Sequence, residues 1–141
     1  MNDLLIYLVD DDEDDRMLLR QAFSQHPASC QIHEFISGAD LIDQLKQTSK
    51  GNYPNLILLD LNMPRMDGFD TLKAIKQHDS WHLIPVVILT TSDDQRDRQR
   101  SLELKADDYM VKPPSYGMLW SIIDRGISIA RQDAAENEAS Q

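Results

Sequence analysis

Residues 56–60 are Leu-Ile-Leu-Leu-Asp, and their pattern indicates the class of fold. Four consecutive apolar residues, without the alternation of a half-exposed strand, are typical of a strand that is buried on both faces. Such strands occur in parallel sheets that helices cover on each side. The stretch therefore predicts a central parallel strand. It also places Asp60 at the carboxyl end of that strand, where ligands bind in open sheets of this kind.

Other apolar runs along the chain have the same form, because a polar residue follows each of them at once. They are Leu4–Val9 before Asp10, Pro85–Leu89 before Thr90 and Tyr109–Val111 before Lys112, with a weaker strand at Gln31–Ile36. Segments with helical spacing of apolar residues lie between and after the strands: Asp12–Ser24, Ser37–Thr48, the region around Leu72 and Ile75, Asp93–Lys105, and Ser115–Ala130. This alternation predicts an α/β fold, a (βα)5 three-layer sandwich with a five-stranded parallel sheet.

Length and charge limit the classes of function. The chain has 141 residues, which suits one domain, and we expect that domain at residues 1–131 with a polar tail at 132–141. The net charge of −10 argues against nucleic acid and against an anionic membrane surface as partners. Cys30 is the only cysteine, and we find no signal peptide and no apolar run of membrane-spanning length. We therefore expect a cytoplasmic protein.

Polar side chains at the ends of the predicted strands suit one chemistry. Asp10 and Asp11 follow the first strand and Asp60 follows the third, and acids so close together repel unless a cation lies among them. Mg²⁺ prefers such oxygen ligands. The hydroxyl of Thr90 and the ammonium of Lys112 would complete a phosphoryl-transfer site, which works mainly by positioning and charge stabilisation. On these grounds Asp60 is either a metal ligand only or a nucleophile that forms an aspartyl phosphate.

Five segments carry a resemblance to a known family: Val9–Asp12, Leu58–Pro64, Met66–Gly68, Leu89–Ser92 and Ala106–Pro113. Taken in this order and at this spacing, they make the chain resemble the receiver domains of two-component response regulators, from about Leu4 to about Ala130. The resemblance implies a flavodoxin-like fold with the strand order 2-1-3-4-5.

The resemblance also implies roles for single residues. Asp60 would be the phosphoacceptor, and Mg²⁺ would be held by Asp11 directly, by Asp10 directly or through water, by Asp60 and by the backbone carbonyl of Asn62. Thr90 resembles the hydroxyl that bonds the phosphoryl oxygen, Lys112 the lysine that pairs with the acyl phosphate, and Tyr109 the aromatic switch residue. Such a domain is not a general enzyme, because it catalyses only its own phosphorylation and dephosphorylation.

The implied function is that of a single-domain response regulator in a phosphorelay, without a DNA-binding output domain. Its phosphoryl group would come from a sensor histidine kinase or a histidine phosphotransferase. Its unknown protein target would bind the face formed by Asp93–Lys105, Tyr109–Val111 and the last helix. The regulator could instead pass the phosphoryl group to a histidine phosphotransferase or form a homodimer, and the sequence fits each of these outputs. The segment Leu89–Ser92 and the loop before Pro85 are similar to small regulators paired with bacteriophytochromes.

Some residues depart from the family pattern or invite a different interpretation. Lys105 stands where the family often has glycine, Pro114 stands where an aromatic or aliphatic residue is frequent, and Asp12 adds a third acid to the first run. We expect Asp14 and Asp15 to be a solvated helix start, where acids interact favourably with the helix dipole.

Two other classes of function share parts of this pattern but lack residues that they need. In a haloacid-dehalogenase-type phosphatase, the second acid of an Asp-x-Asp pair acts as the general acid, but Asn62 occupies that position here. A flavodoxin-like cofactor binder would need a phosphate loop after the first strand, and the acids at Asp10–Asp12 would repel phosphate there.

Overall fold

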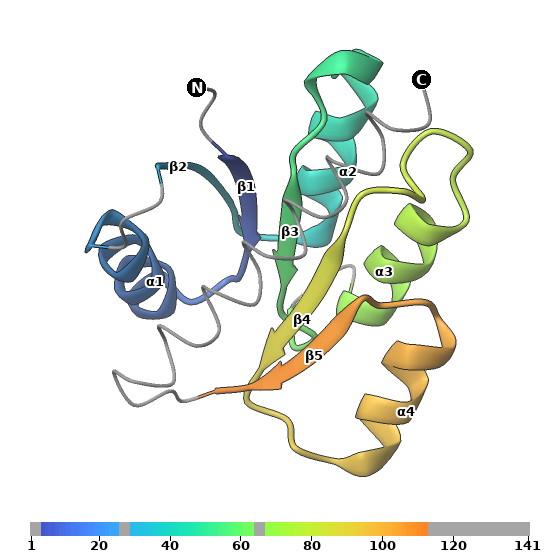
Figure 1. Cartoon of the computed structure of the whole chain (residues 1–141). Helices are drawn as coiled ribbons and strands as arrows, with labels where there is room; N and C mark the ends of the chain where they lie inside the picture. Colours follow the sequence, from blue (N-terminus) through green and yellow to red (C-terminus); the bar gives the residue numbers. More distant parts are fainter. Residues whose placement is uncertain (1–3, 26–28, 64–66, 113–141) are drawn as a thin grey trace.

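The structure is a computed structural model that describes residues 4–25, 29–63 and 67–112 (Figure 1). Strands and helices alternate along it: β1 (Leu4–Val9), α1 (Glu13–Gln25), β2 (Cys30–Phe35), α2 (Gly38–Lys46), a 3-10 turn (Lys50–Asn52), β3 (Leu56–Leu59), α3 (Gly68–Lys76), β4 (Val86–Thr90), α4 (Gln95–Glu103) and β5 (Asp108–Val111). The predicted helix at Ser115–Ala130, Pro64, Pro113, Pro114 and the tail at 132–141 lie outside the described residues.

All five strands are parallel and lie in the order β2-β1-β3-β4-β5, which confirms the predicted topology. The most apolar strand, β3, lies in the middle of the sheet and all four of its residues are buried. The predicted weaker strand, β2, lies at an edge and is only partly buried. The ends of β1 and β3 are as predicted, and the other predicted ends differ from the observed ones by at most two residues, as expected where helices and strands fray.

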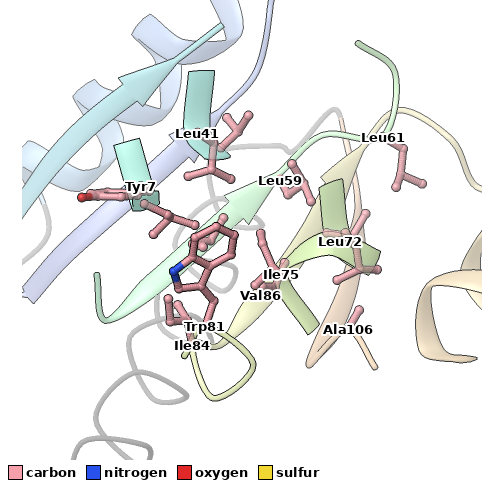
Figure 2. Packing of buried hydrophobic residues seen from close by; sticks show 14 of the residues in the cluster. Tyr7, Leu41, Leu59, Leu61, Leu72, Ile75, Trp81, Ile84, Val86 and Ala106 are labelled. Carbon is pink, nitrogen blue, oxygen red and sulfur yellow. The ribbon is translucent and has the colours of Figure 1, made fainter. Parts of the chain in front are cut away.

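Helices cover both faces of the sheet (Figure 1). On one face, alternate strand residues such as Tyr7, Ile57 and Leu59 pack with side chains of α2 and α3, and Trp81 closes the lower end of this cluster (Figure 2). On the other face, Ile6, Leu8, Leu56 and Leu58 pack against Leu19, Ala22 and Phe23 of α1. Because neighbouring strand residues point to opposite faces, each central strand contributes to both clusters.

Helix α4 ends on a residue with left-handed backbone. Lys105 has a φ of 75°, and around it the N–H of Ala106 donates to the carbonyl of Ser101 while the N–H of Lys105 donates to the carbonyl of Leu102. This pair of bonds is the Schellman arrangement, in which glycine usually occupies the left-handed position. The sequence departure at Lys105 is therefore a substitution at a strained turn and leaves the turn geometry in place.

Replacing Lys105 by glycine is expected to raise the free energy of unfolding by about 1 kcal/mol. The left-handed conformation costs a non-glycine residue roughly 1–2 kcal/mol, and the extra freedom of glycine in the unfolded chain returns part of that gain. Urea unfolding of Lys105→Gly would measure the change. Gln99→Gly, in the exposed middle of α4, is the control and should lower stability by about 1 kcal/mol. A loss of stability in both variants would contradict this account of the turn.

Candidate functional site

The predicted site residues meet at the carboxyl end of the sheet. Strands β1 and β3 pair with Val9 opposite Leu59, so Asp10 and Asp60 leave neighbouring strands at the same level. The N–H of Asp60 donates to the carbonyl of Val9 at 3.0 Å, which continues the sheet up to the acid. On the other side, the N–H of Lys112 donates to the carbonyl of Thr90 at 2.6 Å. Sheet register alone therefore brings these four residues to one edge.

Three carboxylates gather at this edge and form a candidate metal site. Oxygen atoms of Asp10, Asp11 and Asp60 lie within 4.8 Å of one another. Asp10 is 2% exposed and Asp60 is 8% exposed, whereas Asp11 faces solvent. Hard oxygen ligands of which two are buried and one faces solvent suit a divalent cation that keeps some of its water. The acid trio, as we call these three residues, therefore has the donors that the sequence predicted.

Lys112 supplies the positive charge of the site. Its Nζ donates to Asp10 Oδ2 at 2.6 Å, to Asp15 Oδ2 at 2.9 Å and to Asp60 Oδ2 at 3.4 Å. An ammonium has three N–H groups, so these three carboxylates use all of them. The lysine is 6% exposed, and its nitrogen stands directly beside the predicted phosphoacceptor.

Asp15 is a site contact that sequence analysis did not predict. We expected it to be a solvated residue of the helix start, but its carboxylate is only 36% exposed and pairs with Lys112. The two residues are 97 positions apart in the chain. No local pattern in the sequence distinguishes Asp15 from Asp14, so only the fold, which brings the first turn of α1 to the residue after β5, could show the contact.

Burial and charge act against each other on the ionisable groups. Burial by itself lowers the pKa of Lys112, but hydrogen bonds to Asp10 and Asp15 and the charges of Asp60 and Asp10 outweigh it, so the pKa is raised and the ammonium stays charged. Burial raises the pKa of Asp10, and its bonds to Lys112 and to the Asp12 N–H offset only part of this effect. Burial thus keeps the pKa of Asp10 raised even beside the Lys112 ammonium, and a perturbed pKa of this kind is typical of functional acids.

Asn62 and Thr90 lie on the other side of Asp60. The N–H of Asn62 donates to Asp60 Oδ1 at 3.2 Å, and its side-chain amide lies 3.5 Å from the hydroxyl of Thr90. Thr90 is fully buried as the last residue of β4, and its hydroxyl also accepts from the N–H of Ser92 at 3.4 Å. One oxygen of Asp60 thus faces Lys112 and the other faces the Asn62 backbone.

Tyr109 is buried away from the acid trio. Its hydroxyl donates to the carbonyl of Ser92 at 2.7 Å, and the guanidinium of Arg98 lies 4.8 Å from the ring centroid. Burial raises the pKa of the Tyr109 phenol. The predicted switch residue therefore connects β5 to the loop that follows Thr90 and to α4, and it has no described contact with Asp60.

The backbone after Asp60 is held by the start of α3. Asp67 caps this helix by accepting from the N–H of Asp70 at 2.8 Å, and the N–H of Gly68 donates to the carbonyl of Leu61 at 3.0 Å. Gly68 packs so closely that a Cβ atom there would lie 2.5 Å from the carbonyl oxygen of Asp60. The position of the phosphoacceptor candidate thus depends on a glycine outside the site.

Comparison with known proteins gives one consistent result. The profile of the response regulator receiver domain matches residues 6–124. Response regulator Rcp1 from a Synechocystis strain is 34% identical over 124 residues, which cover 84% of this chain and 83% of Rcp1. The probable methanogenesis regulatory protein FilR2 from Methanothrix harundinacea is 33% identical and is matched over 74% of its length.

Solved structures agree with the sequence comparison. The crystal structure of Mn²⁺-bound Rcp1 superposes with a TM-score of 0.77 at 33% identity, covering 84% of this chain and 91% of that one. The phosphorylated cyanobacterial phytochrome response regulator RcpA also gives 0.77, at 31% identity, covering 86% and 89%. Other curated relatives are longer: the chain spans 15% of a sensor histidine kinase and 42% of a transcriptional regulator. Within the described ranges, no helix has the length and apolar character of a membrane span.

Proposed function

The chain belongs to the response regulator receiver family, and from that premise we propose that it accepts a phosphoryl group on Asp60 in a Mg²⁺-dependent reaction and signals by binding another protein. The observation that carries the proposal is the convergence of Asp60 with the rest of the acid trio and with the Lys112 ammonium. Family membership removes the phosphatase and cofactor-binding alternatives from consideration. It leaves the donor, the target and the roles of single residues to be tested.

The proposed chemistry follows from the placement of Asp60. One of its carboxylate oxygens attacks the phosphorus of a phosphohistidine on the donor; the new P–O bond forms as the P–N bond breaks, and the histidine leaves. Lys112 lies 3.4 Å from Asp60 Oδ2 and would neutralise charge on the phosphoryl oxygens. The Thr90 hydroxyl, held near Asn62, would donate to a phosphoryl oxygen. No other catalytic activity is proposed.

Mg²⁺ would be held by Asp10, Asp11, Asp60 and the backbone carbonyl of Asn62. When bound, it would supply positive charge to the carboxylates and to the incoming phosphoryl group. Support for this role comes from the oxygen donors of the trio and from the Mn²⁺ form of the related Rcp1. Mg²⁺ is the proposed ion because it accepts few protein oxygens and retains water.

We further propose how the signal is passed on. Tyr109 and α4 lie on the side of the loop after Thr90, so a shift of Thr90 toward a phosphoryl group would alter the contacts of Ser92 and Tyr109. A protein target that binds this altered face would shift the balance between the two states by its difference in affinity. A second copy of the chain could fill the same role. The proposed setting is the cytoplasm, where the single cysteine Cys30 suits reducing conditions.

The proposed phosphoryl donor is a sensor histidine kinase of the phytochrome type. Support comes from the similar RcpA, whose name identifies it as a cyanobacterial phytochrome response regulator. Phosphotransfer from a panel of purified histidine kinases would test the pairing. Equal rates from phytochrome and non-phytochrome kinases would refute this part of the proposal.

The central test is the intact mass of the protein after incubation with a small acyl phosphate donor. We expect the mass to rise by one phosphoryl group with Mg²⁺ present and not with a chelator present. The added group should be released by hydroxylamine, which cleaves acyl phosphates. A mass gain that resists hydroxylamine, or no gain with Mg²⁺ bound, would overturn the proposed function.

Mg²⁺ is also expected to stabilise the folded chain. An ion that binds only the native state adds about 2.7 kcal/mol at a hundredfold excess over its Kd, and it relieves the repulsion within the acid trio. Thermal unfolding with and without Mg²⁺ would show a rise in Tm of several degrees. Asp11→Asn should lose most of this rise, whereas Asp14→Asn, at an exposed position outside the trio, should keep it. A rise of the same size in both variants would argue against the trio as the binding site.

A further inference from the structure

Three carboxylates share the ammonium of Lys112, and they are not equivalent. Asp10 and Asp60 belong to the acid trio, and both are almost completely buried. Asp15 comes from the first turn of α1, lies outside the trio and bonds Nζ at 2.9 Å. It is thus the one described partner of Lys112 that a cation or a phosphoryl group in the site would leave unaltered.

Asp10 and Asp60 become poorer hydrogen-bond acceptors for Lys112 when a cation or a phosphoryl group occupies the site. Oxygens of the trio that turn toward a divalent cation are weaker acceptors for a neighbouring ammonium, because both positive charges compete for the same lone pairs. When Asp60 becomes an acyl phosphate, its carboxylate charge is lost and the negative charge lies instead on the phosphoryl oxygens, toward which Lys112 would have to be directed. Lys112 must nevertheless keep its nitrogen beside Asp60, and its long stem has many rotamers to choose from. A fixed partner outside the trio would meet this requirement.

The start of α1 is built to hold Asp15 in place. The N–H of Asp15 donates to Asp12 Oδ1 at 3.0 Å, which caps the helix start. The next residue, Arg16, donates from its guanidinium to the carbonyl of Asp10 at 2.7 Å and to Glu34 of β2 at 3.1 Å. Asp15 is therefore held by its own backbone and by its neighbour, both attached to the same end of the sheet as the site.

We propose that Asp15 is a positioning residue that keeps the Lys112 ammonium directed at Asp60 when the acid trio is occupied. The inference rests on the proposed function and deepens it by adding a residue of α1 to the phosphoryl-transfer machinery. Asp15 does not touch the reacting atoms, so its effect passes through Lys112. It also links the lysine at the end of β5 to helix α1, across the sheet from α4.

The first test compares rates of phosphorylation by a small acyl phosphate donor at saturating Mg²⁺. Asp15→Asn, which keeps the shape and removes the charge, should slow the reaction by about tenfold, the lower range for partners that orient a site residue. Asp14→Asn removes the same charge from the same exposed turn and should change the rate only slightly. Asp15→Glu should recover part of the loss. Equal rates for Asp15→Asn and Asp14→Asn would overturn the proposal.

The second test is a double-mutant cycle read out by Mg²⁺ affinity, measured by calorimetry without any phosphoryl donor. Without Asp15, less of the positive charge of Lys112 is balanced from outside the trio and the ammonium repels the ion more strongly, so Asp15→Asn should weaken Mg²⁺ binding more than Asp14→Asn does. In the Lys112→Ala background, Asp15→Asn and Asp14→Asn should change the Mg²⁺ affinity by similar amounts, because the lysine through which Asp15 acts is absent. A difference of unchanged size in that background would overturn the proposal.

The two tests separate the inference from the function on which it rests. A wild-type chain that gains no phosphoryl group would contradict the proposed function before any variant is compared. The Mg²⁺ cycle would still decide in that case whether Asp15 acts through Lys112. Melting temperatures of all variants would show that they fold, which is expected because Asp15 and Asp14 lie at or near the surface.

Discussion

Asp60→Asn is expected to take up no phosphoryl group under conditions in which, by the proposed function, the wild-type chain gains one. The reason is that an amide is a poor nucleophile and carries no negative charge. The substitution keeps the size of the side chain and one oxygen to accept from the Asn62 N–H, which lies 3.2 Å from Asp60 Oδ1. It also removes one charge from the acid trio, so the variant should be at least as stable as the wild type.

Intact mass and a thermal melt on the same samples would test this prediction. Asp43→Asn, at an exposed position of α2, is the matched control and should gain a phosphoryl group like the wild type. Asp10 and Asp11, the other acids of the trio, are the alternative acceptors. If Asp60→Asn gained the same mass as the wild type, the acceptor would be another residue and the roles proposed for Lys112 and Thr90 would have to be reassigned.

Gly68→Ala is expected to lower the stability of the chain markedly, although it changes no polar group. The added Cβ would lie 2.5 Å from the carbonyl oxygen of Asp60 and 2.5 Å from the Cα of Leu61. Both are backbone atoms and cannot turn aside as the end of a side chain can. The start of α3 and the loop after β3 must therefore move apart. Overpacking of this kind costs about 1–3 kcal/mol, and we expect the upper part of that range.

Gly51→Ala provides the control, because a Cβ there would meet nothing within 4 Å. Urea unfolding should show a lower midpoint for Gly68→Ala and little change for Gly51→Ala. The displaced Asp60 backbone should also slow phosphorylation of the Gly68 variant, since phosphoryl transfer is sensitive to small errors in position. Full stability together with full phosphorylation in Gly68→Ala would show that α3 can shift without cost to the site.

The parts of the fold that follow from local pattern could be predicted from sequence. Residues 56–59 are continuously apolar and form the central strand, and alternation of strands and helices gives a parallel sheet. The strand order came from the family resemblance and is confirmed. The ends of α4 were predicted two residues too far on each side, because its charged sequence has few apolar residues to mark them.

The candidate site was predictable as a set of strand ends but not as a set of contacts. Asp10, Asp60, Thr90 and Lys112 each follow or end a strand, so the topology alone brings them together. The Asp15 contact depends on the rotation of α1 and could not be found in this way. The inward position of Tyr109 depends on the carbonyl of Ser92 and on Arg98 of α4, which are also contacts over long sequence distances.

The three bonds of the Lys112 ammonium have a consequence for the resting protein. They give the acidic site a counterion that is covalently part of the chain, so dilution and chelators cannot remove it. A metal ion that binds here would replace part of the positive charge that Lys112 already supplies to the trio carboxylates. It would not be the first positive charge beside them. The folded state is therefore expected to persist without Mg²⁺, and under the proposed function Mg²⁺ would control whether Asp60 takes up a phosphoryl group.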